Sequence, residues 1–407
     1  MSQTPSPPSS APTPNYAAPQ LSRRGLPRMQ ELGLIIVIAV VSLFLWLASH
    51  DISKVIPAKE VTDSAGHVVT LPMMTSTENG FLRVQNIAIV LTYMSWMAIM
   101  AMGQTTVIIS GGIDISVGSI MGLSALVTAL VLQNFAPDAP AWQIIPLGIG
   151  IPLGVGLLCG FINGILVVGL RMHPFIVTLA TLSIFRWACL KIGAAHQGSL
   201  PSGDKVLPDA FGDRFVAWEF HYHRFGGRIT ENIQPVPFLV MLLCLLLGWL
   251  YLRHTVWGRE NYAVGGNEEA AKFSGIRVPY VKLRVYLISG LSCGIAGMLN
   301  CGFFKSAVTD TGKGYELNVI AAAVVGGASL LGGRGTALGA VLGMLVLGLI
   351  ENGINILQQV NLGVTTVKVV REDQQLILGV AVILAVAVDQ FSMYLQSRRS
   401  ARLRTAH

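Results

Sequence analysis

One stretch of the chain comes close to a phosphate-binding loop. Residues 266–272 nearly follow the pattern G-x-x-x-x-G-K-[ST], in which backbone N–H groups surround a phosphate. The pattern fails at two positions, because Ala271 replaces the second glycine and Phe273 replaces the hydroxyl residue. No H-E-x-x-H zinc motif occurs either. We therefore expect no catalytic residues and no nucleotide site in this chain, so that any ATP hydrolysis must come from a partner.

The cysteines and histidines form no metal-ligand pattern. All five cysteines lie inside apolar segments and none forms a C-x-x-C pair, so we expect packing residues without disulfides or zinc: Cys159, Cys189, Cys244, Cys293 and Cys301. His221 and His223 could bind a metal, but the sequence favours a pair of surface histidines. We therefore predict no metal site.

Polar side chains within apolar segments are scarce, and they are the candidates to line a pathway: Gln104, Asn163, Asn300, Glu351, Asn352 and Asn355. Asp114, in the short segment between two apolar runs, is added to this set. An ion-coupled transporter usually needs several carboxylates inside the membrane. Glu351 is the one clear candidate, and it either lines a path or bonds to a neighbouring asparagine. The set favours a path for a neutral hydroxylated solute. An ion-coupled secondary transporter of a small neutral solute is the alternative.

Composition decides which elements must position these residues. Of the 407 residues, 52% are hydrophobic and 12% charged, whereas an average soluble domain has about 25% charged residues. This excludes a soluble multidomain protein and a wholly disordered chain. We predict an all-α polytopic membrane protein with about ten transmembrane helices. The predicted spans are 31–49, 84–110, 115–134, 142–170, 174–194, 235–252, 283–304, 317–333, 335–357 and 374–393.

Charge sets the predicted orientation. With both termini in the cytoplasm, the cytoplasmic segments hold 15 basic and six acidic residues, and the outer segments hold 11 basic and 14 acidic ones. Because no convincing cleavage site follows the first span, we expect that span to be retained. The predicted organisation is a disordered cytoplasmic leader (1–30), a transmembrane domain (31–394) with periplasmic insertions at 50–83 and 195–234, and a basic cytoplasmic tail (395–407). The second insertion is expected to have a small fold of its own.

Glycines recur at a spacing of four residues, a pattern that lets helices approach closely. They are Gly156, Gly160 and Gly164; Gly290 and Gly294; and Gly335, Gly339 and Gly343. The pairs at 111–112 and 332–333 predict two tight turns between helices.

A cytoplasmic loop at 253–282 carries signals for a short helix. Asn267 is a good N-cap, two glutamates follow it, and Gly275 can end the helix. Pro279 is expected to prevent its resumption. The predicted helix has about two turns, too few to be stable alone, and it would expose Ala270, Ala271 and Phe273. Such a helix could serve as a lever for a motor subunit.

Five motifs, in order, resemble the membrane permeases of ribose/xylose-type ABC sugar importers. The similarity covers roughly 84–194 and 235–393. The motifs are G-G-I-D-I-S-V-G-S at 111–119; N-G at 163–164 with P-F-I-V-T-L at 174–179; Y-A-V-G-G-N-E-E-A-A at 262–271; G-Y-E-L at 314–317 with G-G-A-S at 326–329; and G-G-R-G-T at 332–336. The insertions at 50–83 and 195–234 are longer than the family leads one to expect.

The resemblance implies an ABC importer permease fold and a homodimer in the bacterial inner membrane. It implies two further partners, a cytoplasmic tandem-domain ATPase that holds ATP and Mg²⁺, and a periplasmic sugar-binding protein; nucleic acid is not expected. The residues that would couple the chain to the ATPase are Gly265, Gly266, Asn267, Glu268, Glu269, Ala270, Ala271, Ser274 and Gly275. The turn at 111–118 would shape an inner constriction, in which Asp114 could cap a helix starting at Ile115 or serve as a structural cap alone.

Overall fold

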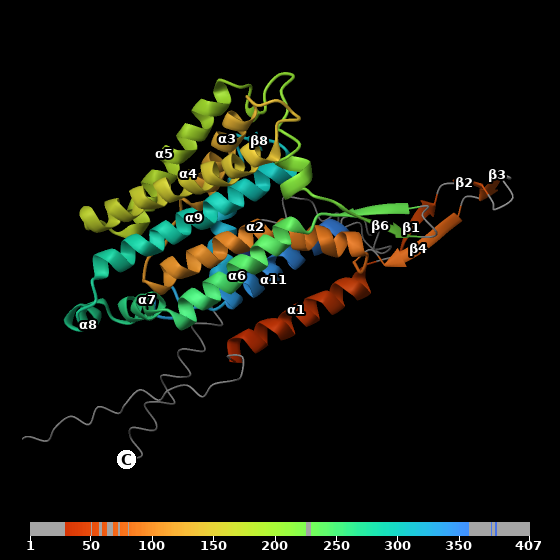
Figure 1. Cartoon of the computed structure of the whole chain (residues 1–407). Coiled ribbons are helices and arrows are strands. Elements are labelled where there is room, and N and C mark those ends of the chain that lie inside the picture. Colours follow the sequence, from red (N-terminus) through yellow and green to blue (C-terminus); the bar gives the residue numbers. More distant parts are fainter. Residues whose placement is uncertain are drawn as a thin grey trace, which may run out of the picture.

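Long apolar helices lie side by side in the computed structural model (Figure 1). The structure describes residues 29–49, 51–56, 59–62, 68–71, 74–79, 81–224, 229–357, 376, 379 and 380. Its helices are α1 (Met29–Ala48), α2 (Val84–Ile109), α3 (Val117–Leu132), α4 (Ala141–Gly169), α5 (Pro174–Ala194), η1 (Gly212–Val216), α6 (Val236–His254), α7 (Val256–Gly266), α8 (Glu268–Phe273), α9 (Val278–Phe304), α10 (Tyr315–Val325) and α11 (Ala337–Leu357).

These helices confirm the prediction of an all-α polytopic membrane protein. Within the described residues, six helices are long and apolar enough to cross a membrane: α2, α4, α5, α6, α9 and α11. The apolar helices α1, α3 and α10 are shorter over their apolar parts. The predicted span 374–393 lies almost entirely outside the described residues, so the count of ten stays a prediction.

One predicted span is wrong in its extent. Instead of a helix over 317–333, α10 ends at Val325 and the chain continues without a helix to residue 336. The reason is local, because Gly327, Gly332 and Gly333 all have positive φ angles, which only glycine adopts at little cost. The positive φ values of Gly332 and Gly333 agree with the predicted turn, although it belongs to a longer connection.

The glycine spacing brings α4 and α9 into the most extensive helix contact of the described chain. A Cβ atom on Gly156 would collide with the carbonyl oxygen of Gly290, and one on Gly160 would collide with that of Tyr286. These two helices share more contacts than any other pair. The prediction of close packing is therefore confirmed here, and side chains of any size would force the helices apart.

One end of the bundle carries β-strands and the other carries the short helices α7 and α8. Four hairpin pairs or short ladders are formed by β1 (Asp51–Ile56) with β4 (Met74–Asn79), β2 (Lys59–Thr62) with β3 (Val68–Leu71), β5 (Ser199–Leu200) with β8 (Ala307–Val308), and β6 (Phe220–Arg224) with β7 (Ile229–Ile233). Figure 1 shows the β1–β4 and β6 strands at one end of the bundle, and α7 and α8 at the opposite end. The last two residues of the predicted leader, Met29 and Gln30, begin α1 instead; the rest of the leader and the basic tail lie outside the described residues.

Candidate functional site

The short helix α8 forms where its capping signals predict. The Asn267 side chain accepts a hydrogen bond from the Ala270 N–H at 2.9 Å, which satisfies one of the free donors of the first turn. At the other end, Gly275 has a φ of 81° and its N–H donates to the Lys272 carbonyl. The Phe273 side chain, 89% exposed, points away from the rest of the chain. The helix thus presents a large apolar side chain at the end of the bundle.

Two details of this region correct the sequence prediction. Ala271 is buried against the α7 and α9 segments rather than exposed, in a cluster with Val264 and Val278. Pro279 does not prevent a helix, because α9 begins at Val278. Proline is tolerated in the first turn of a helix, where its missing N–H has no partner to lose.

Helix α7 was not predicted, and it contains part of the expected coupling set. Gly265 and Gly266 end α7, and Asn267 separates α7 from α8. Ser274 and Gly275 form the C-terminal cap of α8 rather than part of the helix. The residues of the coupling set therefore lie together, but on two helices and the cap that follows.

Helix α7 is held against the end of α2 by direct backbone approach. The Asn261 amide donates to the Thr106 carbonyl at 2.9 Å, and the Tyr262 hydroxyl donates to the Gly335 carbonyl at 2.7 Å. Gly265 packs directly onto the backbone of Ile109 and Gly333. The Gly333 N–H in turn donates to the Ile109 carbonyl at 2.9 Å. A movement of α7 would therefore be transmitted to the last turn of α2.

The connection that follows α2 contains a buried polar cluster centred on Asp114. Its Oδ1 atom accepts from the Ser116 N–H at 3.0 Å and from the Ser116 hydroxyl at 2.6 Å. Its Oδ2 atom accepts from the Ser289 hydroxyl of α9 at 2.9 Å. The Asn163 amide of α4 donates to the Ser116 hydroxyl oxygen at 2.8 Å. Asp114 is fully buried, so the turn at 110–116 ties together three helices.

Gln104 also contacts this cluster. In the amide orientation that satisfies both partners, Gln104 donates to the Asp114 carbonyl (3.2 Å) and accepts from its N–H (3.1 Å). Two buried polar atoms nearby, Asn163 Oδ1 and the Tyr286 hydroxyl, have no hydrogen-bond partner within the described chain. An unpaired buried polar atom carries a desolvation cost of about 1–3 kcal/mol, and this cluster holds two of them.

One of the two predicted roles of Asp114, the cap of a helix starting at Ile115, is wrong. The helix begins at Val117 with Ser116 at its N-cap position. The carboxylate instead closes the turn two residues on, by accepting from Ser116. Gly111, with a φ of 83°, provides the left-handed backbone conformation that the turn needs.

The remaining predicted pathway residues do not join this cluster. Asn352 exchanges two hydrogen bonds with Asn86 of α2, at 2.8 and 3.2 Å. Glu351 is half-buried and has no hydrogen bond or ion pair within the described chain, Asn300 is buried, and Asn355 is exposed. The structure therefore separates the predicted set into the Asp114 cluster and residues spread over α9 and α11.

Two sets of contacts stabilise the fold without any signal in the sequence. Arg186 of α5 donates to the carbonyls of Thr309 and Thr311 at 3.1 and 2.9 Å, which fixes the segment before α10. Tyr93, Trp96, Phe303 and Phe304 form an aromatic cluster with ring centroids 5.1–6.1 Å apart. Their spacing in the sequence, with two rings on α2 and two on α9, gives no signal before the helices are placed.

Motifs for other chemistry lack their structural context. Residues 290–294 read G-x-S-x-G, the pattern of a serine nucleophile on a strand-to-helix turn. They lie inside α9 instead, and the Ser292 hydroxyl donates to the Ser289 carbonyl at 2.7 Å. The described residues contain no group of three or more possible metal ligands, and the His221 ring contacts the Asn232 side chain. The side chain of His223 lies outside the described ones.

Comparison with known proteins gives a consistent result. Residues 86–387 match the family described as "Branched-chain amino acid transport system / permease component". The chain is 35% identical to the ribose import permease protein RbsC of Bacillus subtilis, over 76% of this chain and 86% of that protein. It is 35% identical to the D-allose transport system permease protein AlsC of Escherichia coli, over 76% and 85%, and 33% identical to the fructose import permease protein FrcC of Rhizobium meliloti, over 76% and 79%. No solved structure matches the chain significantly.

Proposed function

Because the chain belongs to the permease-component family that matches residues 86–387, we propose that it is the membrane subunit of an ATP-driven importer of a monosaccharide. Relatives named for ribose, allose and fructose transport support a sugar as the substrate class. They differ in the sugar that they name, so the proposal extends to the class alone. The chain is a multi-pass membrane protein, and the proposed location is the bacterial inner membrane with α8 on the cytoplasmic side.

The observation that carries the coupling part of the proposal is α8 with its exposed Phe273. A helix of six residues is too short to be stable alone, yet this one is capped at both ends and anchored through Ala271. Aromatic side chains are enriched at protein interfaces, and an exposed phenylalanine on such a helix is therefore a candidate anchor for a partner. We assign the partner as a cytoplasmic ATPase with two nucleotide-binding domains, which would hold ATP and Mg²⁺.

A mechanical route connects this helix to the membrane interior. Helix α8 is joined to α7 through Asn267, and α7 contacts the Ile109 backbone through Gly265. The chain then enters the turn that holds Asp114 five residues further on. We propose that ATP-driven movement of α8 passes along this route and rearranges the Asp114 cluster, which acts as the inner constriction.

The unpaired atoms of the cluster fit such a gate. Asn163 Oδ1 and the Tyr286 hydroxyl are buried without partners in the described chain, and an opening of this cluster would give them water or a sugar hydroxyl to bond. The closed arrangement is therefore less stable than it would be with a complete network, by about 1–3 kcal/mol per unpaired atom. A partner that binds one of two conformations more tightly can shift the balance between them.

The direct test is uptake in proteoliposomes that contain the chain, its ATPase and its periplasmic sugar-binding protein. The double variant Gly266→Asp/Glu269→Arg changes the charge of the coupling surface without filling occupied space, because a Cβ on Gly266 meets nothing within 4 Å. We expect membrane insertion to stay normal while uptake and stimulated ATPase activity fall. Wild-type uptake in this variant would exclude the coupling assignment.

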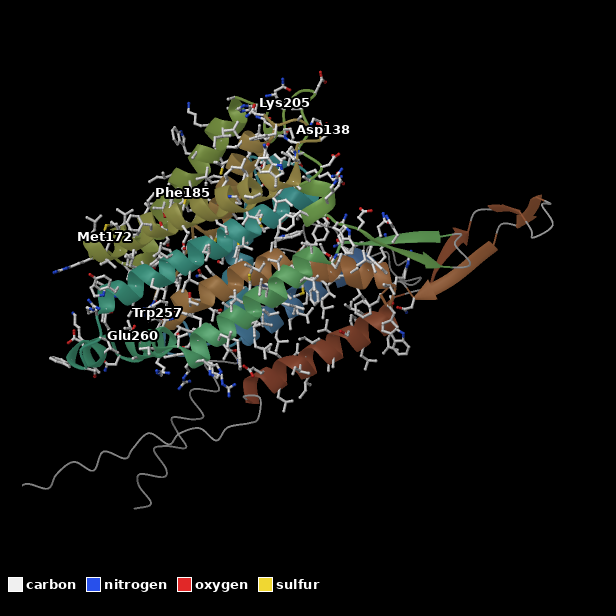
Figure 2. All side chains as sticks on the ribbon, in the orientation of Figure 1. Asp138, Met172, Phe185, Lys205, Trp257 and Glu260 are labelled. Atoms are coloured by element: carbon white, nitrogen blue, oxygen red, sulfur yellow. The ribbon has the colours of Figure 1, made fainter. Side chains whose placement is uncertain are left out.

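A matched control separates coupling from a general effect of charge. Asp138→Arg also makes the local charge more positive, on an exposed residue at the opposite end of the bundle (Figure 2), and it should leave capture of the ATPase unchanged. Uptake by the chain alone, driven by an ion gradient, would contradict the proposal and favour the secondary-transporter alternative. The homodimer and the sugar-binding protein would be tested in the same preparation by cross-linking.

A further inference from the structure

A pocket of about 510 Å³ opens beside α8 at the same end of the bundle, and it takes no part in the route to Asp114. Its walls come from α7, from the α8–α9 connection and from the first three turns of α9. The lining residues used below are Trp257, Glu260, Arg277, Tyr280, Leu283, Arg284 and Leu287. Figure 2 shows Trp257 and Glu260 on α7 at this end.

The charges in the pocket leave one positive charge without an ionic partner. The Arg284 guanidinium donates to a carboxylate oxygen of Glu260 at 3.0 Å and to the Trp257 carbonyl at 3.2 Å, so these two charges neutralise each other. Its Nε atom remains buried without a hydrogen-bond partner in the described chain. Arg277 makes no ion pair there, and its guanidinium lies over the Tyr280 ring at 4.9 Å. Glu268 of the adjacent helix α8 is paired with Lys282 at 2.8 Å.

Along α9 the pocket carries one unpaired charge at its rim, followed by apolar side chains between which only the Arg284–Glu260 pair is charged. Arg277 precedes the helix, Tyr280 lies in its first turn, and Leu283 and Leu287 follow one and two turns deeper. With a rise of about 1.5 Å per residue, the distance from Arg277 to Leu287 is about 15 Å along the axis. That is the order of depth from a headgroup into the acyl region.

The aromatic side chains place the rim of the pocket at the membrane surface. Trp257 and Tyr280 are 58% and 62% exposed, and tryptophan and tyrosine are enriched where a membrane protein meets the headgroup layer. Each ring lies beneath an arginine of the same pocket, with Arg284 5.3 Å from the Trp257 ring. A guanidinium held in this way is weakly hydrated and suits a phosphate, which it can bind through two N–H groups.

We propose that this pocket binds the phosphate of an anionic phospholipid, with the headgroup at Arg277 and an acyl chain along Leu283 and Leu287. Basic pockets at the surface of membrane proteins hold such headgroups. The unpaired charge of Arg277 favours an anionic lipid over a zwitterionic one. The proposal depends on insertion of the chain in a membrane and does not depend on its sugar substrate or its ATPase.

The test measures lipid retained by the full chain purified in mild detergent, by native mass spectrometry after addition of phosphatidylglycerol or phosphatidylcholine. The wild type is expected to retain phosphatidylglycerol at least fivefold more than phosphatidylcholine, and Arg277→Ala should remove this preference. Arg277→Lys should restore part of it. Arg259→Ala is the matched control, because Arg259 is an exposed arginine of α7 that does not line the pocket.

Each other outcome would overturn the proposal. Equal losses in Arg277→Ala and Arg259→Ala would mean that lipid follows overall charge. Displacement of phosphatidylglycerol by inorganic phosphate at millimolar concentration would mean that the ligand is a free phosphate compound. Release of the lipid when a partner protein binds to α8 would assign the pocket to a protein interface instead.

Discussion

Gly265 offers the sharpest test of the route from α8 to the membrane interior. A Cβ atom added there would collide with the Ile109 carbonyl oxygen and lie 2.7 Å from both the Ile109 carbonyl carbon and the Gly333 nitrogen. These neighbours are backbone atoms, so no side-chain rotation can relieve the collision. Gly265→Ala must therefore move α7 away from the end of α2.

The cost of this movement can be worked out from the contacts. Overpacking of a close contact costs about 1–3 kcal/mol, and loss of the hydrogen bond from Gly333 to Ile109 adds about 1 kcal/mol. A shift of 2 kcal/mol between two conformations changes their ratio about 30-fold. We expect sugar uptake to fall at least tenfold, while capture of the ATPase by α8 is retained.

A glycine with free space provides the control. Gly169 also ends a helix, and a Cβ on it would meet nothing within 4 Å. Any gain in helix propensity, about 1 kcal/mol at most, is therefore similar in Gly169→Ala and Gly265→Ala. The assay is sugar uptake in proteoliposomes together with thermal unfolding in detergent. Equal uptake by the two variants would refute the idea that α7 acts on α2 through this contact.

Three further predictions concern other parts of the chain. Asp114→Leu leaves the donors of Ser116 and Ser289 without an acceptor, and each unpaired donor costs about 1–3 kcal/mol. The yield of this variant in membranes should therefore fall well below that of Asp114→Asn. Equal yields would contradict a central role for the carboxylate. Phe273→Ala should leave thermal stability unchanged, because the side chain is almost fully exposed, while binding of the ATPase measured by surface plasmon resonance weakens at least tenfold; unchanged affinity would exclude Phe273 as an anchor. A double-mutant cycle of Asn86→Ala and Asn352→Ala should give a coupling of about 0.6–1 kcal/mol in unfolding free energy, and additive effects would show that their two hydrogen bonds contribute nothing.

The sequence predicted the parts of the site that depend on interactions between residues close together in the chain. The caps at Asn267 and Gly275 fix α8 within the residues predicted, because capping acts over three or four positions. Helix α7 has one such signal, because the Thr255 side chain at its N-cap accepts a hydrogen bond from the Gly258 N–H. Gly258, Gly265 and Gly266 lower its helix propensity, however, so the sequence as a whole did not predict it. It is held by tertiary contacts such as the hydrogen bond from Asn261 to Thr106. This hydrogen bond joins residues 155 positions apart.

The pathway residues show the same division. Their scarcity in apolar segments singled them out, but sequence alone could not sort them by face or by partner. Gln104, Asp114 and Asn163 meet because α2, α4 and the turn at 110–116 converge. Asn352 finds its partner in Asn86, a residue outside the predicted set, at a separation of 266 residues. Such pairs depend on the order in which the helices pack, which no local pattern records.

The shortness of α10 has a consequence for the biogenesis of the protein. Its 11 residues extend about 16 Å, roughly half of the thickness of about 30 Å that an independent span must cover. Backbone groups before and after it need protein partners inside the bilayer, and α11 packs along it through Gly339 and Gly343. We therefore expect the translocon to release α10 and α11 together as a helical hairpin, so a nascent chain truncated after residue 336 would leave α10 uninserted.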